Sequence, residues 1–202
     1  MGHQGLIARL NQIKSRSNNL KSLVISFYPH PAKVLGKVTD FKVLTLLRKK
    51  LSILSELGVD YLGLVHFTEN FSNLTPEHFI NDVLIEQYKV KQLVVGPDTK
   101  IGKDRTGDIE LLKRLCRDKN ISIEVVPFLS HNETKIGSRG IKGAIIEGDL
   151  DLAKAALGRI YSIQGRVIRG DGRGKKLGIP TANIGYRNQM LPPDGVYAGY
   201  VL

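Results

Sequence analysis

The sequence predicts an α/β protein in which a parallel, doubly wound domain is followed by a shorter β-rich module. Over the first 157 residues, apolar strand-like runs alternate with helical patterns, which is typical of a parallel sheet covered by helices. From Ile160 the pattern changes to strand-like segments broken by glycine, so we place the domain boundary near Gly158. The expected domains are therefore residues 1–157 and 158–202.

Local signals support the individual elements. An amphipathic helix is expected at the start, because Leu6 and Leu10 lie on one apolar face of a helical pattern. Thr75 followed by Pro76 and Glu77 is typical of a helix start, with a capping side chain, a proline at the first helical position and an acid in the first turn. The expected strands are 23–27, 61–67, 92–95 and 121–126, the further helices are 42–57, 76–88, 108–119 and 149–157, and strand-like segments follow at 161–168 and 195–201.

Composition narrows the class of protein. The 202 residues are 42% hydrophobic, enough for a sizeable core, but no apolar run approaches the roughly 20 residues that span a bilayer. The single cysteine, Cys116, excludes a disulfide framework within the chain and fits a cytoplasmic protein, and we expect it to be an inert, half-buried helix residue. The net charge of +11 is densest in residues 158–202, where seven Lys and Arg accompany two Asp. This distribution favours nucleotide phosphates over nucleic acid as the acidic ligand.

Polar residues follow three of the expected strands. His30, between two prolines, follows the first strand, Asn70 follows the second, and Gly96 and Asp98 follow the third. Ligands of a parallel sheet bind beyond the carboxyl ends of its strands, so these residues are candidates for a polar pocket. Turn chemistry alone also enriches Pro, Asn, Asp and Gly at such places, and for His30 this alternative stays open.

A second group of candidates lies where a further helix is expected to begin. Ser138 and Arg139 stand at this start, and Lys142 follows one turn later. A hydroxyl, a helix N-terminus and two cations together favour a nucleotide phosphate.

The most informative stretch is the glycine-rich segment Gly165 to Asn183. It contains five glycines within fourteen residues, interleaved with five Lys and Arg. Backbone amides that glycine leaves uncovered, beside cations, favour a phosphate chain, and hydroxyl and amide oxygens suit Mg²⁺. The alternative is a basic surface hairpin with glycine turns. The candidate ligand-binding residues are Gly170, Gly172, Gly174, Lys176, Gly178, Pro180, Thr181 and Asn183.

This stretch resembles the start of the flavokinase module of the bacterial bifunctional riboflavin kinase/FMN adenylyltransferase (FAD synthetase) family. There, a glycine-rich loop and a G-[FI]-P-T-A-N motif, which reads Gly178 to Asn183 here, bind ATP and Mg²⁺. The resemblance thereby implies Thr181 and Asn183 as metal ligands. It further implies a small antiparallel β-barrel of which 158–202 is the C-terminally incomplete start, with the acidic catalytic base beyond Leu202.

The first domain resembles the FMN adenylyltransferase half of that family, a Rossmann-like nucleotidyltransferase with an H-x-G-H signature. Gly2 and His3 match the end of this signature, and the match continues in register to Leu202. Residues 1–157 would then be N-terminally incomplete; a fragment of a longer enzyme is preferred over a natural short form. The resemblance implies catalytic roles for His3, Ser138, Arg139 and Lys142, and cofactor binding by Asn70, Gly96 and Asp98.

The implied function is flavin cofactor biosynthesis. Riboflavin and ATP would give FMN, and FMN and ATP would give FAD with release of pyrophosphate, with Mg²⁺ as cofactor and these small molecules as the partners. Neither a nucleic acid nor a membrane is expected as a partner.

Departures from the family pattern leave two alternatives open. Thr99 and Ile101 replace phenylalanines expected against the flavin. Gly137, Arg139 and Lys142 replace serine, threonine and arginine of an I-S-S-T-x-I-R motif, and lysine lacks the planar fork of arginine. The first alternative is a riboflavin kinase whose other domain is structural or a flavin- or nucleotide-binding regulator. The second is a basic, noncatalytic nucleotide- or RNA-binding protein.

Overall fold

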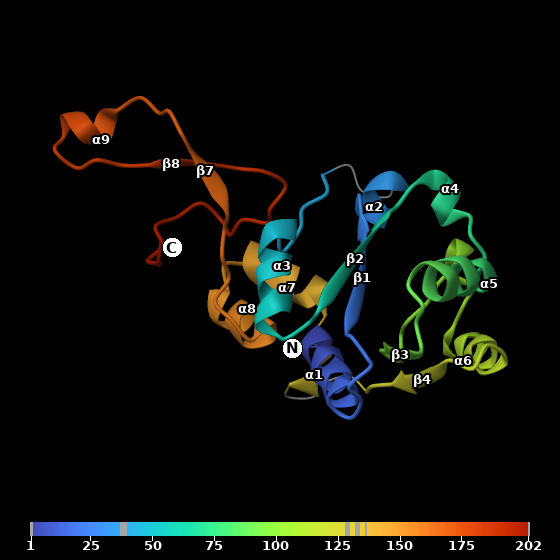
Figure 1. Ribbon diagram of the computed structural model, residues 1–202. Helices are drawn as coiled ribbons and strands as arrows, with labels where there is room; N and C mark the ends of the chain where they lie inside the picture. Colours follow the sequence, from blue (N-terminus) through green and yellow to red (C-terminus); the bar gives the residue numbers. More distant parts are fainter. Residues whose placement is uncertain (1, 37–39, 128–129, 132–133, 136, 202) are drawn as a thin grey trace. The chain divides into compact units, whose positions relative to one another are not determined.

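The computed structural model describes residues 2–36, 40–127, 130–131, 134–135 and 137–201. Two compact units are present, one made of Met1–Phe41 and Leu51–Lys135 and the other of Lys42–Lys50 and Ile136–Leu202. The first contains two parallel strand pairs with helices, and the second contains helices and an antiparallel strand pair (Figure 1). The predicted mixed α/β class with parallel strands is confirmed.

The elements follow the predicted order. In the first unit the strands are β1 (Leu23–Tyr28), β2 (Tyr61–His66), β3 (Gln92–Val95), β4 (Ser122–Val125), β5 (Ser130–His131) and β6 (Thr134–Lys135). Its helices are α1 (Gly2–Ser15), α2 (Pro31–Val34), α4 (Glu69–Ser72), α5 (Pro76–His78), the π-helix η1 (Phe79–Gln87), the 3-10 turn η2 (Lys103–Arg105) and α6 (Ile109–Asp118). Helix α3 (Leu47–Glu56) runs from the second unit into the first, and the second unit continues with α7 (Ser138–Ile146), α8 (Leu150–Leu157), β7 (Gly165–Ile168), α9 (Arg173–Lys176) and β8 (Asn183–Tyr186).

The helix start predicted at Thr75 is built as its capping residue indicates. The Thr75 hydroxyl accepts a hydrogen bond from the backbone N–H of His78, with Pro76 at the first helical position. Asp108 caps α6 in the same way. The helix predicted from residue 42 begins instead at Leu47, because Val43 forms a backbone bridge with Gln189. This long-range pairing overrides the helical pattern of residues 42–46.

Helix η1 supplies four of the seven buried residues of the main hydrophobic cluster in the first unit. Its Phe79, Ile80, Val83 and Leu84 are buried against β1, β2, β3 and β4. The widened π form is closed by a hydrogen bond from Tyr88 N to Val83 O, 3.1 Å. Residues of all four strands therefore pack against the same helix, although each sheet contains only two strands. The ribbon view shows β1 and β2 side by side (Figure 1).

A polar cluster anchors α1 to the start of β1 and β2. The Asp60 carboxylate accepts hydrogen bonds from Ser22 N (2.7 Å) and Ser22 Oγ (2.8 Å) and lies 3.1 Å from Lys14 Nζ. These bonds lower the pKa of Asp60 to about 2, and Ser22 is completely buried. Lys14 also donates to the Gly58 carbonyl, at 2.8 Å. The lysine thus bridges the helix and the turn that precedes β2.

Cys116 corrects one prediction. It is a helix residue as expected, on α6, but it is completely buried rather than half-buried, and burial raises the pKa of its thiol. Because the thiolate is the reactive form, burial and the raised pKa both favour an inert cysteine.

The predicted β-barrel of the second module is not confirmed. Strands β7 and β8 form a two-stranded antiparallel sheet that does not close, and residues 195–201 form no regular element. Apolar side chains of this hairpin stay exposed, including Val167 and Ile184. Among the residues that the structure describes, no helix has the length and apolar character required to cross a membrane.

Candidate functional site

The carboxyl ends of β1 and β2 meet at a cluster of four phenylalanine rings. Phe27 at the end of β1 lies 5.6 Å from Phe67 and 5.8 Å from Phe71 between ring centroids, and Phe71 lies 6.2 Å from Phe79 of η1. Such separations are typical of favourable edge and tilted aromatic contacts. The carboxyl ends of these two strands therefore lie at a partly buried cluster of aromatic side chains.

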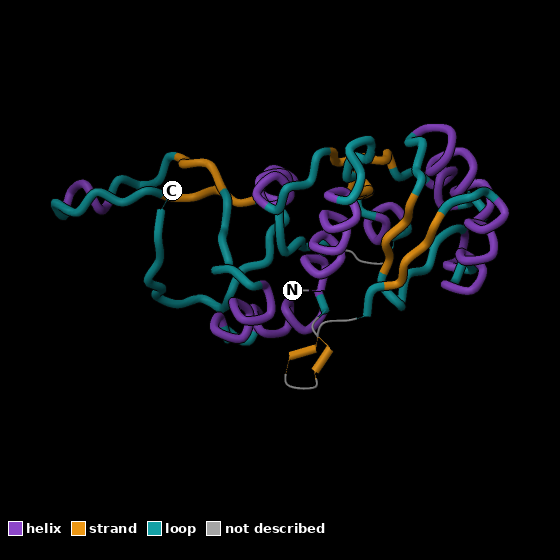
Figure 2. Tube along the Cα trace, turned by 60° about the horizontal axis from the view of Figure 1, so that its bottom comes forward, coloured by secondary structure: helices purple, strands orange, loops and turns teal. Residues whose placement is uncertain are grey.

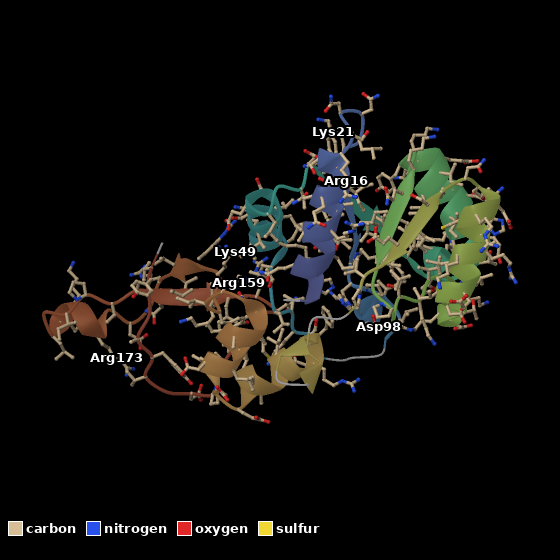
Figure 3. All side chains as sticks on the ribbon, turned by 90° about the horizontal axis from the view of Figure 1, so that it is seen from below. Arg16, Lys21, Lys49, Asp98, Arg159 and Arg173 are labelled. Carbon is tan, nitrogen blue, oxygen red and sulfur yellow. The ribbon has the colours of Figure 1, made fainter. Side chains whose placement is uncertain are left out.

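Three polar candidates of the first unit follow β2 or β3, and the fourth lies on α1. Asn70 is an exposed residue of α4, which Thr68 caps by accepting a hydrogen bond from Phe71 N at 3.1 Å. Gly96 is buried at the end of β3, and Asp98 is exposed in the turn that follows (Figure 3). His3 is exposed on the first turn of α1. Asn70, Gly96 and Asp98 are thus placed after the strands that the sequence indicated.

His30 takes part in the local structure. Its Nδ1 accepts a hydrogen bond from Ala32 N at 3.1 Å and thereby caps α2, and its ring lies 4.4 Å from the ring of Phe41 between centroids. An acceptor Nδ1 places the ring proton of a neutral imidazole on Nε2. The capping bond supports the interpretation of His30 as a turn residue.

Thr99 and Ile101, the two residues near Asp98 that differ from the family pattern, have different surroundings. Ile101 packs against the core cluster of η1, and its backbone exchanges two hydrogen bonds of 2.9 Å with Gly107. Thr99 is half-buried and donates its backbone N–H to Gly96 O at 3.1 Å. Ile101 therefore has a packing role that the sequence did not reveal.

A shallow cavity of about 310 Å³ in the first unit lies apart from the predicted residues. Its lining includes Thr75, Lys103 and Asp104, and no predicted site residue belongs to it. Asp104 and Arg105 both adopt left-handed backbone angles, with φ of +51° and +61°. The strand ends and this cavity thus indicate different candidate sites, and the chemistry of the residues favours the strand ends.

The candidates Ser138, Arg139 and Lys142 all lie on α7, in the second unit. Ser138 and Arg139 are exposed at the start of the helix, which begins after Gly137 without a side-chain cap. Lys142 is half-buried, and its Nζ donates a hydrogen bond to the Lys42 carbonyl at 2.7 Å. The structure therefore gives Lys142 a contact with the chain that the sequence did not predict.

The glycine-rich segment forms a loop that folds back on the T-A-N residues. A Cβ added to Gly170 would collide with the side-chain amide of Asn183, and one added to Gly174 would meet the Ile179 carbonyl and lie 2.7 Å from Thr181 Oγ1. Ile179 N donates to Gly174 O at 2.9 Å and closes this turn. Gly170 and Gly174 are thus required by close approach to the residues that the motif indicates as ligands.

The loop itself carries several positively charged side chains. Arg173, Lys175 and Lys176 lie on α9, at the end of the hairpin that is farthest from α7 and α8 (Figure 3). Arg173 pairs with Asp171 at 2.9 Å, and both side chains are mostly exposed. Gly172 and Gly178 flank α9 with φ of +67° and +77°, angles that glycine adopts without strain. The arrangement combines exposed charge with glycine backbone, as a phosphate-binding loop requires.

Thr181 and Asn183 offer oxygen donors of the kind that Mg²⁺ accepts beside nucleotide phosphates. The Thr181 side chain lies directly against Gly174, and the Asn183 side chain lies directly against Gly170. Over the described part of the chain, no group of three or more His, Cys, Asp or Glu side chains forms a metal-binding cluster.

Comparisons with known proteins match both units. A family described as FAD synthetase matches residues 1–140, and one described as riboflavin kinase matches residues 157–202. The chain is 37% identical to proteins named bifunctional riboflavin kinase/FMN adenylyltransferase from Buchnera aphidicola subsp. Schizaphis graminum, Escherichia coli strain K12 and Bacillus subtilis strain 168. These matches cover 98%, 100% and 98% of this chain and 64%, 64% and 62% of the relatives, so the chain spans less than two thirds of their length.

A solved structure is also similar. It is titled "Crystal Structure of Macrolide-efflux Protein from Streptococcus pneumoniae" and superimposes with a TM-score of 0.85 at 29% sequence identity. The similarity covers 97% of this chain and 64% of that chain.

Proposed function

The chain belongs to the FAD synthetase family, and we propose that the protein makes flavin cofactors in two steps. In the first step, the terminal hydroxyl oxygen of the riboflavin side chain attacks the γ-phosphorus of ATP, the bond to the β-phosphate oxygen breaks, and ADP leaves as the hydroxyl proton goes to a base. In the second, a phosphate oxygen of FMN attacks the α-phosphorus of a second ATP, and pyrophosphate leaves. The residue types and the named relatives both support this proposal.

We assign the kinase step to the β7–β8 hairpin. Backbone N–H groups of Gly170, Gly172 and Gly174 would contact the ATP phosphates, and the nearby cations would offset their charge. Thr181 and Asn183 would hold the magnesium ion, which supplies charge neutralisation on the phosphates. The observation that most supports this assignment is the packing of Gly170 and Gly174 directly against Asn183 and Thr181. Lys176, Gly178 and Pro180 complete the assigned segment.

We assign the adenylyl step to two sets of residues, by resemblance. In the first unit these are His3, Asn70, Gly96 and Asp98. In the second unit Ser138 and Arg139 at the start of α7 are the candidates for phosphate contact, and Lys142 is a further candidate despite its bond to Lys42. Positioning and charge stabilisation account for most of the rate of such a transfer.

The decisive experiment assays the protein at its natural length with riboflavin, ATP and Mg²⁺ and separates FMN from FAD by chromatography. We expect both products. The Asn183→Ala variant should stop FMN formation but still convert added FMN to FAD, which would assign the two steps to different sites. Absence of both products from the wild-type protein would contradict the proposed function.

A second candidate function is riboflavin kinase activity alone. The packing of Ile101 into the core and the glycine at position 137 favour it, because a flavin-facing phenylalanine and a serine hydroxyl are both missing. FMN accumulation without FAD, even when FMN and ATP are supplied in excess, would support this candidate. We further propose a cytoplasmic protein that binds these small molecules rather than nucleic acid; tight, strongly salt-dependent RNA binding would contradict this.

A further inference from the structure

Gln189 is a buried polar residue beside the apolar cluster of the second unit. Gln189 is only 1% exposed, and the next residue, Met190, belongs to that cluster. The Oε1 atom accepts a hydrogen bond from Gln164 N at 3.0 Å, and the Nε2 atom donates one to Ser162 O at 2.6 Å. Burial of an amide is unfavourable without partners, so a side chain with both ends bonded to backbone indicates a specific connection.

This connection joins the two ends of the hairpin. Ser162 and Gln164 lie directly before β7, and Gln189 lies shortly after the end of β8. Tyr161 adds a hydrogen bond from its hydroxyl to Met190 O at 2.7 Å. The chain that enters the hairpin and the chain that leaves it are therefore tied together at its base.

The backbone around Gln189 is held as well. Val43 N donates to Asn188 O at 2.7 Å, and Met190 N donates to Val43 O at 3.0 Å, which makes a parallel bridge centred on Gln189. Asn188 adopts a φ of +48°, an angle that few residues other than glycine adopt. Gln189 thus has a fixed backbone from which to hold residues 162–164.

The hairpin has few other restraints. All four residues of β7 are exposed, as are three of the four residues of β8. The ribbon and tube views show the hairpin running outward from α7 and α8, with α9 at its far end (Figures 1 and 2). A small rotation at the base is therefore enlarged at the glycine loop, because the loop lies at the opposite end of the hairpin.

We propose that Gln189 is a positioning residue for the phosphate loop. By tying residues 162–164 to the chain that follows β8, it sets the direction in which the hairpin presents Gly170–Gly174, Thr181 and Asn183 to ATP. This inference rests on the proposed riboflavin kinase function. Gln189 itself contacts the protein backbone and not the nucleotide, so it acts through the loop.

The test replaces the side-chain amide of Gln189 by groups of similar volume. Gln189→Leu removes both hydrogen bonds with little change in size, and Gln189→Glu keeps an acceptor for Gln164 N while it removes the donor to Ser162 O. The matched control is Gln164→Ala, which deletes an amide side chain at the same base but keeps the backbone N–H that Gln189 contacts. In the protein at its natural length, we expect both Gln189 variants to raise the KM for ATP in FMN formation about tenfold. The control should stay within about twofold of the wild type.

A purely structural role would give a different result. It would lower the melting temperature and the amount of active protein, and hence kcat, while the KM for ATP stayed unchanged. An unchanged KM for ATP in either active Gln189 variant therefore overturns the inference. If Gln189→Leu fails to fold, Gln189→Glu still provides the comparison.

Hydrogen exchange separates this inference from the proposed function. We expect faster amide exchange across Gly165–Ile168 in the Gln189 variants, with α7 and α8 as protected as in the wild type. A wild-type protein that forms no FMN contradicts the proposed function. Hydrogen exchange then tests only whether Gln189 holds the base of the hairpin. Exchange of β7 that matches the wild type overturns the proposed role of Gln189 in either case.

Discussion

Helix η1 and the β7–β8 hairpin contain similar apolar side chains but expose them to opposite extents. Leu84 of η1 is 1% exposed and packs among the strands of the first unit, whereas Leu177 of the hairpin is 79% exposed. The helix places no predicted ligand residue, and the hairpin places most of those assigned to ATP. Stability and ligand binding are therefore expected to depend on different segments, so that substitutions separate the two properties.

The largest expected effect lies in the core. Leu84→Ala removes a completely packed side chain, and cavity formation should lower the free energy of unfolding by about 2–5 kcal/mol. Leu177→Ala is the matched control, and its effect should stay within about 0.5 kcal/mol because the side chain is exposed. Urea unfolding followed by circular dichroism measures both. Equal losses would show that the hairpin is packed against something in solution, which would remove the contrast between the two regions.

The next effect concerns the loop. Gly174→Ala should lower the rate of FMN formation at least about tenfold, because the new Cβ would meet the Ile179 carbonyl and Thr181 Oγ1 and displace the loop. The melting temperature should stay unchanged, since the loop contributes little to the core. Steady-state assays of FMN formation measure the rate, and calorimetry measures the melting temperature.

Gly199→Ala is the control for this prediction, because no atom lies within 4 Å of the added Cβ. It should retain the wild-type rate. A Gly174→Ala variant with full activity would mean that the close approach to Thr181 does not matter for ATP.

The sequence predicted the elements of the first unit well because local signals and burial agree there. Periodicity placed β3 at its observed bounds, and the capping residue Thr75 placed the start of α5. The glycine and T-A-N segments were predicted as one binding region, and Gly170 and Gly174 do contact the side chains of Asn183 and Thr181.

Long-range contacts could not be predicted from the same signals. No local pattern indicates that Val43 pairs with Gln189, that Lys142 bonds to the Lys42 carbonyl, or that a glutamine would be buried. The β-like alternation of residues 195–201 also failed to produce a strand, since a strand needs a neighbour to pair with. Partners distant in sequence decided each of these cases.

Low pH should reduce the stability of the first unit, because Asp60 becomes protonated. Its folded pKa of about 2 lies below the ordinary value of 3.8, so its stabilising contribution is present above about pH 3.8 and is lost as the pH falls toward 2. Asp60→Asn should therefore reduce stability at neutral pH and make stability less dependent on pH between about 4 and 2. Unfolding free energies of the two proteins across this range provide the measurement. A variant with the pH dependence of the wild type would exclude the contacts with Ser22 and Lys14 as the cause.

The last prediction concerns Lys142 in the second unit, where we expect a small change in the free energy of unfolding. Its ammonium donates to the Lys42 carbonyl, so Lys142→Ala should lower the free energy of unfolding by about 0.5–1.5 kcal/mol, whereas Lys154→Ala, at an exposed position of α8, should change it little. If that bond is the whole role of Lys142, conversion of FMN to FAD should persist in the variant. Loss of FAD formation with unchanged stability would instead mean that the ammonium leaves the carbonyl to contact a phosphate, as the family resemblance implies. The two assays together thus decide whether α7 contributes a structural contact or a catalytic one at this position.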